Sequence, residues 1–126
     1  MRTKIAILAA SFVALSAAPS VQAHAKLLTE TPAINASGTA PAQITLNFSE
    51  KLVPAFSRVM LKMVSMPGMD MPTPQDVTVK SSVSADGKSL VAVPAEALDA
   101  GKYVVEYRAV SVDTHTVKGT YMFTVQ

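Results

Sequence analysis

The sequence predicts an all-β protein: a single antiparallel Greek-key β-sandwich or barrel of about seven strands, immunoglobulin-like or cupredoxin-like. Three observations support this prediction. The chain has 126 residues, of which 49% are hydrophobic, which suits one compact domain. Short runs rich in β-branched and aromatic residues recur between turn-forming residues. Two of these runs alternate apolar and polar side chains, the pattern of an antiparallel sheet with one buried face.

Seven runs are predicted strands. The alternation is clearest in two of them, where one face carries Ile44, Leu46 and Phe48 and another carries Tyr103, Val105 and Tyr107. In chain order the predicted strands are Lys26–Thr29, Gln43–Phe48, Arg58–Val64, Val77–Val83, Ser89–Pro94, Gly101–Val110 and Thr116–Val125. Seven short strands within about 100 residues favour a Greek-key sandwich or barrel.

Turn-forming residues fill the gaps between the predicted strands. Asn35–Gly38 lies between two prolines, and Ala85–Lys88 and Leu98–Gly101 each contain Asp and Gly, which are typical of turns. Residues 95–98 also fit one short helical turn. The segment Met66–Pro74 contains too much Pro and Gly for a strand interior, so we expect an exposed loop there.

Residues 1–23 have the three parts of a signal peptide. Arg2 and Lys4 give a positive start, the uncharged run Ile5–Ala18 has 14 mostly small and apolar residues, and a region of small residues follows. This run is shorter than the ~20 residues that a membrane-spanning helix needs. We therefore expect export to an oxidising compartment and a mature domain of residues 24–126 that does not span a membrane.

The position of cleavage decides the chemistry of the new amino terminus. Two registers satisfy the small-x-small rule, one cutting before His24 and the other before Lys26. The first leaves a histidine whose free α-amine, with a pKa of about 7.7–8.0, and imidazole can chelate one metal ion. The second removes that chelate.

Charge and cysteine content exclude several classes of function. Loss of Arg2 and Lys4 with the leader leaves nine Lys and Arg against nine Asp and Glu, so the basic balance that a nucleic-acid partner would require disappears. The chain contains no Cys, which excludes a disulfide scaffold, a thiolate zinc site and a cysteine nucleophile.

Methionine is concentrated in one segment. Five of the seven methionines fall between Met60 and Met71. Thioether sulfur is a soft, neutral ligand that suits Cu(I) where a thiol would be oxidised. This favours a Cu(I) site, with an exposed apolar patch for a protein partner as the alternative. Met63 alternates with Val59 and Leu61 and could equally be a core residue, whereas Met60 shares a strand face with Arg58. The predicted Cu(I) ligands are Met63, Met66, Met69 and Met71.

A second candidate cluster follows the strand that ends near Val110. In extended chain Asp113 and His115 project to the same side and could face one ion. A mature chain beginning at His24 has two histidines. If the fold brings His24 to His115, the donors are an amine, two imidazoles and a carboxylate, a set that favours Cu(II).

Four motifs in this order resemble the CopC family of periplasmic copper-resistance proteins over essentially the whole mature chain. They are His24-Ala25-Lys26-Leu27, Asn47-Phe48-Ser49-Glu50, Met66-Pro67-Gly68-Met69 and Tyr107-Arg108-Ala109-Val110-Ser111-Val112-Asp113-Thr114-His115.

The resemblance implies an antiparallel β-sandwich or barrel in the periplasm that binds copper at two sites. It implies a Cu(II) site from His24, Asp113 and His115 near the amino terminus, with Glu50 as an outer carboxylate or weak axial donor, and a Cu(I) site in the methionine segment. It favours cleavage before His24. The implied partners are a CopD-type inner-membrane copper transporter and other periplasmic copper proteins.

The chain departs from the family pattern in the methionine segment. Met71 stands where well-known members have a histidine, and Pro74 stands where a further methionine is expected. An all-thioether set lacks an imidazole that could hold Cu(II), so we expect stricter selectivity for Cu(I).

A copper carrier or buffer, and not an enzyme, is the function that these residues favour. A histidine-brace copper oxygenase shares the amine and two imidazoles, but the lack of Trp, the small size and Asp113 at the position that oxygen would need disfavour it. A metal-free β-sandwich interaction module is the third alternative. The sequence shows no Gly-x-Ser-x-Gly element and no phosphate-binding loop.

Overall fold

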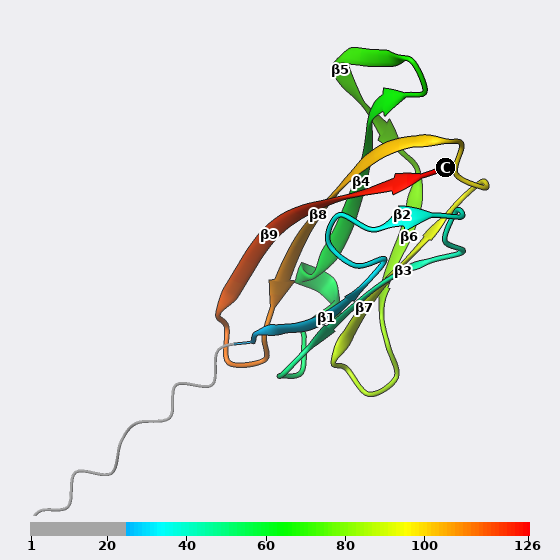
Figure 1. Ribbon diagram of the computed structural model, residues 1–126. Helices are drawn as coiled ribbons and strands as arrows, with labels where there is room; N and C mark the ends of the chain where they lie inside the picture. The colour runs from blue at the N-terminus through cyan, green and yellow to red at the C-terminus, as the bar shows by residue number, and fades with distance from the viewer. Residues whose placement is uncertain (1–24) are drawn as a thin grey trace, which may run out of the picture.

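The computed structural model describes residues 25–126, which form two packed β-sheets (Figure 1). One sheet has four strands in the order β1-β3-β7-β6, and the other has five in the order β2-β9-β8-β4-β5. The predicted all-β sandwich is confirmed. The elements are β1 (Leu27–Thr31), β2 (Ser37–Gly38), β3 (Ile44–Phe48), the 3₁₀ turn η1 (Pro54–Phe56), β4 (Arg58–Met66), β5 (Met69–Val77), β6 (Val79–Val83), β7 (Ser89–Pro94), β8 (Gly101–Val110) and β9 (Thr116–Val125).

Neighbouring strands pair antiparallel, except that the two residues of β2 pair parallel with the end of β9. The longest ladder joins β8 to β9 over ten residue pairs, from Gly101↔Val125 to Val110↔Thr116. Because β8 also pairs with β4, these three strands form a continuous frame from one end of the sandwich to the other. That frame positions both candidate sites.

The core lies between the sheets and follows the alternation in the sequence. Ile44, Leu46 and Phe48 of β3 are at most 2% exposed. On the facing sheet, the ring of Tyr103 stacks on Phe123 with centroids 5.4 Å apart, an arrangement typical of packed aromatic residues.

The expected loop Met66–Pro74 is wrong, because β5 begins at Met69 and runs to Val77. Strand β5 lies at the sheet edge, where one side of the strand has no partner. Its register with β4 shifts between Ser65↔Asp70 and Met63↔Gln75, and both prolines of the strand fall within that shift. A missing proline N–H therefore breaks no regular ladder bond, which is how edge strands tolerate proline.

Three further details differ from the sequence predictions. Residues 25–126 form nine strands, of which β2 and β5 were not predicted. The predicted strand Val77–Val83 is divided at Thr78, where the chain passes from the five-stranded sheet to the four-stranded sheet. Residues 95–98 form no helical turn, since residues 95 and 96 are bends and residues 97 and 98 are irregular. Within residues 25–126 no helix is long and apolar enough to cross a membrane.

Candidate metal centres at the two ends of the sandwich

The turn between β8 and β9 forms the first candidate site. Ser111 N–H donates to the carbonyl of His115 at 3.0 Å, and Thr114 N–H donates to the carbonyl of Ser111 at 2.8 Å. Thr114 has a φ of 73°, a left-handed conformation that turns the chain back into β9. Asp113 and His115 therefore lie on a short, closed turn.

Hydrogen bonds hold the side chains of this turn in place. Ser111, which is completely buried, donates its hydroxyl hydrogen to the Asp113 carboxylate. The other carboxylate oxygen of Asp113 lies 3.0 Å from Nδ1 of His115, and His115 N–H lies 3.3 Å from Oδ1. A carboxylate bonded to an imidazole nitrogen fixes the orientation of the ring, as in many metal sites.

The same contacts keep Asp113 ionised. The Ser111 hydroxyl, followed by His115, lowers the pKa of Asp113 to about 2. Hydrogen bonds to the charged form of a carboxylate favour that form. At neutral pH the turn thus presents a negative carboxylate next to an oriented imidazole.

The segment Ser49–Leu52 contacts both the first described residues and this turn. Lys26 N–H donates to Oγ of Ser49 at 2.9 Å, and Ser49 N–H donates to the carbonyl of Lys26 at 2.9 Å. At the other end of this segment, Leu52 forms an isolated bridge with Ser111. Residue 25 and the Asp113 turn therefore lie at the same end of the sandwich, as Figure 1 shows for the start of β1 and the β8–β9 turn.

Of the other predicted residues, Glu50 lies within the Ser49–Leu52 segment and is partly exposed. His24 lies outside the described residues. Among residues 25–126 no group of three or more His, Cys, Asp or Glu side chains is arranged to hold a metal ion. The described part of this end thus contributes two predicted ligands, Asp113 and His115, that contact each other.

The β4–β5 hairpin forms the second candidate site. Met66 and Met69 are paired residues on either side of Pro67 and Gly68, and Gly68 has a φ of 75°. A type II turn requires a positive φ at its third residue, usually a glycine, and commonly has proline at its second residue, which is the pattern of Pro67 and Gly68. Side chains paired across strands have Cβ atoms about 4.5–5.5 Å apart, so the turn brings two thioethers together.

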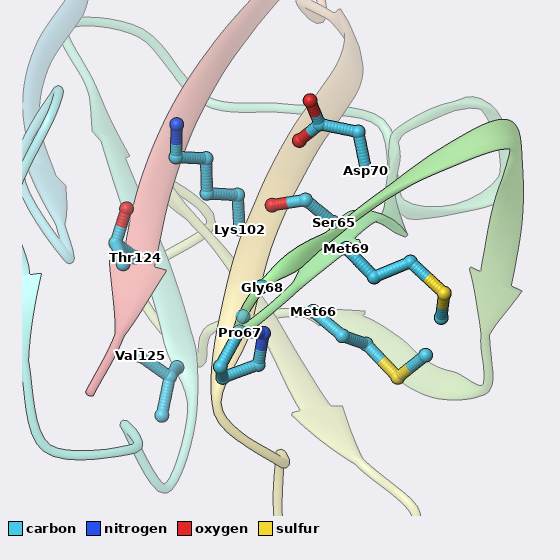
Figure 2. A pocket seen from close by; sticks show the side chains of 10 residues that line it. Ser65, Met66, Pro67, Gly68, Met69, Asp70, Lys102, Thr124 and Val125 are labelled. Carbon is cyan, nitrogen blue, oxygen red and sulfur yellow. The ribbon is translucent and has the colours of Figure 1, made fainter.

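The side chains of Met66 and Met69 face solvent, with exposed fractions of 38% and 54%. Figure 2 shows both extending to one side of the hairpin, away from Lys102 and Thr124. The hairpin and the ends of β8 and β9 border a pocket of about 510 Å³. Two sulfur atoms are thus available at the hairpin tip.

The other two predicted Cu(I) ligands lie farther from the turn. Met71 follows Met69 by two residues on β5 and is half-buried against the core. Met63 is 7% exposed and belongs to the core cluster. Met60 is exposed on the outer face of β4, the face predicted for it. The structure brings Met66 and Met69 together and leaves Met63 inside the sandwich.

The two candidate sites are far apart. The methionine hairpin lies beyond the start of β8, whereas the Asp113 turn follows its end (Figure 1). Ten residues of strand at about 3.3 Å each separate them by roughly 30 Å. One ion cannot bind to both at once.

Sequence reasoning missed Ser111, the residue that anchors the Asp113 turn. The feature of the sequence that could have identified Ser111 is its position as a single hydroxyl residue within the apolar run Ala109-Val110-Ser111-Val112. Because buried polar groups are normally hydrogen-bonded, a serine in such a run indicates a specific partner. The sequence does not show that the partner is Asp113.

A model of the CopC domain matches residues 27–126. The chain belongs to the CopC family. It is 46% identical over 124 residues to Copper resistance protein C of Xanthomonas campestris pv. juglandis, covering 98% of this chain and 94% of that relative. It is 45% identical over 107 residues to Copper resistance protein C of Escherichia coli, covering 85% of each.

Solved structures agree with this family and with its fold. Selenomethionine PcoC, a copper resistance protein from Escherichia coli, is 44% identical and superposes with a TM-score of 0.76, covering 80% of this chain and 99% of that chain. CopC from Methylosinus trichosporium OB3b is 28% identical with a TM-score of 0.68, covering 82% and 94%. The resemblance stated from the sequence motifs is confirmed.

Proposed function

We propose that this chain is a periplasmic copper carrier or buffer in copper resistance or homeostasis, and that it acts by binding and not by catalysis. Relatives that match most of the chain at 45–46% identity are copper resistance proteins by name. Export by the leader 1–23 and cleavage before His24 belong to the proposal. A CopD-type inner-membrane transporter and other periplasmic copper proteins are the proposed partners.

Cu(II) is proposed to bind at the turn end, through His24, Asp113 and His115. The observation that carries the proposal is the ionised Asp113 beside an oriented His115, at the end of the sandwich where the described residues begin. Nitrogen donors with a carboxylate are the set that Cu(II) prefers. Glu50 is proposed as an outer carboxylate. It lies in the segment Ser49–Leu52, which contacts both Lys26 and Ser111.

Cu(I) is proposed to bind at the hairpin tip. Met66 and Met69 supply the first two thioethers, because the turn already pairs them on an exposed surface. Met71 is the third proposed donor, since it follows Met69 on the same strand face. Met63 requires a rearrangement of the core to reach an ion, so it is the fourth and weakest donor.

Copper titration of the mature protein tests both sites. The chain is purified from the periplasm, its intact mass establishes the first residue, and a chain that begins at Lys26 serves as the matched control. We expect one Cu(II) by absorbance and one Cu(I) by competition with a chelating dye. The Lys26 chain should lose the Cu(II) site and keep the Cu(I) site.

Three results would contradict parts of the proposal. A chain beginning at His24 that binds no Cu(II) at neutral pH rejects the turn site. Equal Cu(II) affinity of the Lys26 chain removes His24 from it. Peroxide-driven oxidation of a polysaccharide by the copper-loaded protein would replace the carrier with an oxygenase.

A further inference from the structure

The outer face of the five-stranded sheet carries more basic than acidic side chains, with Asp76 of β5 lying opposite Lys62. The described chain as a whole is balanced, with nine Lys and Arg and nine Asp and Glu. The three central strands β4, β8 and β9 carry five cations and one acid. These residues are Arg58, Lys62, Lys102, Arg108, Lys118 and Glu106.

Three of these cations form a row across the sheet. Arg58 is paired with Arg108, and Arg108 is paired with Lys118, so the three lie side by side on adjacent strands. All three are exposed. We call Arg58, Arg108 and Lys118 the cationic row.

The cationic row has no acidic partner among the described residues. Glu106, the acid of these strands, lies 3.5 Å from Lys62. The other ion pair of the described chain joins Asp113 to His115. Like charges directly opposite one another destabilise a sheet, so an added anion would relieve this repulsion.

A groove of about 450 Å³ runs along the row. Its lining consists of the three cations together with Met60, Glu106, Tyr107, Gly119 and Thr120, and the Glu106 carboxylate is the one that lies 3.5 Å from Lys62. Gly119 contributes no side chain, and Met60 offers an apolar contact that is 37% exposed. The groove therefore places three positive side chains next to an apolar contact from Met60.

We propose that the cationic row binds an acidic segment of a partner protein, through Asp or Glu carboxylates. The row spans two strand spacings, about 10 Å in total, whereas alternate residues of an extended peptide are about 7 Å apart. Two or more carboxylates of one peptide can therefore contact it, and Arg can bind a carboxylate through two parallel hydrogen bonds. A narrow peptide enters a groove that a flat bilayer surface does not.

The row also lies close to the β8–β9 turn. Arg108 is two residues from the end of β8, and Lys118 is the third residue of β9. A partner bound here would contact the protein beside Asp113 and His115. The inference is independent of the proposed copper sites, because the row contains none of their ligands.

A fluorescent hexaglutamate peptide tests the inference by anisotropy at low ionic strength. The variant R58Q/R108Q removes two charges from the row, and K80Q/K88Q removes two exposed charges from other parts of the surface. We expect R58Q/R108Q to weaken peptide binding about tenfold and K80Q/K88Q to change it less than about twofold. Binding should weaken at 1 M salt, where the screening length is about 3 Å.

Separate controls test whether the variants fold and whether small anions bind to the row. Relief of repulsion should give R58Q/R108Q a thermal midpoint at low salt no lower than that of the parent, and Cu(II) and Cu(I) affinities should not change. Equal loss of peptide binding in both double variants would reduce the effect to net charge and overturn the inference. Saturation of the row by millimolar inorganic phosphate, or binding to phosphatidylserine vesicles without binding to the peptide, would overturn it as well.

Discussion

The two ends of the sandwich differ in what positions their proposed donor atoms. At the turn end a buried serine, an ionised aspartate and a histidine are joined by hydrogen bonds. At the hairpin end Met66 and Met69 are placed by a Pro-Gly turn on an edge hairpin. An imidazole and a carboxylate need a set orientation and protonation state, whereas a thioether is neutral at any pH and needs only proximity. The turn end is therefore predicted to be sensitive to single hydrogen bonds, and the hairpin end to the number of methionines.

His115→Ala should produce the largest effect, and it should change the affinity of the turn end only. Loss of an outer-sphere partner commonly costs 10–100-fold in metal affinity, so loss of His115 as a proposed ligand should weaken Cu(II) binding by more than about 100-fold. Cu(I) affinity should not change, because the hairpin lies roughly 30 Å away. Competition titrations with both oxidation states measure this.

Val112→Ala is the matched control for His115→Ala, since Val112 is 62% exposed on the same turn. It should leave both affinities within about twofold. A parallel loss of Cu(I) binding in His115→Ala would indicate that the two ends are coupled through the fold.

Gly101→Ala should have the next largest effect, and it tests the close packing between the start of β8 and the β4–β5 hairpin. A Cβ at Gly101 would lie 2.3 Å from the carbonyl oxygen of Ser65, and its φ is 154°. We expect a loss of about 2 kcal/mol in the free energy of unfolding, from backbone displacement and strain. Denaturant unfolding of the apo protein measures this.

Gly68→Ala is the comparison within the same hairpin. Its φ of 75° also disfavours alanine, but a Cβ there meets no atom within 4 Å. The expected loss is about 1 kcal/mol, from backbone conformation alone. Equal losses for the two glycines would mean that the close approach of Gly101 to the Ser65 carbonyl adds no cost beyond backbone conformation.

The sequence predicted the sandwich well because the alternation of apolar and polar residues along a strand follows which side chains are buried. Each residue of Ile44, Leu46 and Phe48 lies in the core, and the strands Ser89–Pro94, Gly101–Val110 and Thr116–Val125 have the predicted bounds. Strand β5 was missed because the rule against proline in strands assumes partners on both sides. Whether a strand lies at an edge is a property of the whole sheet, which local sequence does not contain.

The candidate sites were predictable in part. The i, i+2 spacing predicted Asp113 and His115 on one side of an extended chain, and the two side chains do lie together, but on a turn in which Thr114 has a φ of 73°. The spacing could not show this turn or the hydrogen bond from Ser111 that holds Asp113. For the methionines, composition predicted an exposed cluster. The alternation of Met63 with Val59 and Leu61 already allowed a core position, which the structure shows. That Met66 is paired with Met69 is known only from the register of the hairpin.

Replacement of the hairpin pair, M66L/M69L, tests the hairpin end directly. Leucine keeps the size and apolar character and removes the sulfur atoms, so stability should change by less than about 1 kcal/mol. Two of the four proposed donors are lost, so Cu(I) affinity should fall by at least the ~10-fold that loss of an outer-sphere partner costs, while Cu(II) affinity should not change. Met122→Leu, a methionine 40% exposed on β9, is the control and should leave Cu(I) binding unaltered.

Ser111→Ala should have the smallest effect and tests whether the turn end depends on a single hydrogen bond. Alanine fits the buried site and removes the hydroxyl that bonds to Asp113. The pKa of Asp113 should rise from about 2 toward the ordinary value of ~3.9, with the bond to His115 keeping it somewhat lower. Carboxyl carbon shifts in an NMR titration of the apo protein measure this, and we expect Cu(II) affinity to fall about tenfold.

The pH dependence of stability gives the Ser111→Ala prediction an independent readout. A carboxyl whose pKa is lower in the folded state stabilises the fold above its unfolded pKa, and this contribution is lost as pH falls through the folded value. In the parent protein the contribution of Asp113 is thus present above about pH 4 and lost between about pH 4 and pH 2. Ser111→Ala should narrow this window, because the two pKa values approach each other, whereas M66L/M69L should leave it unchanged. An unaltered acid-unfolding profile in Ser111→Ala would mean that Asp113 is held by His115 alone.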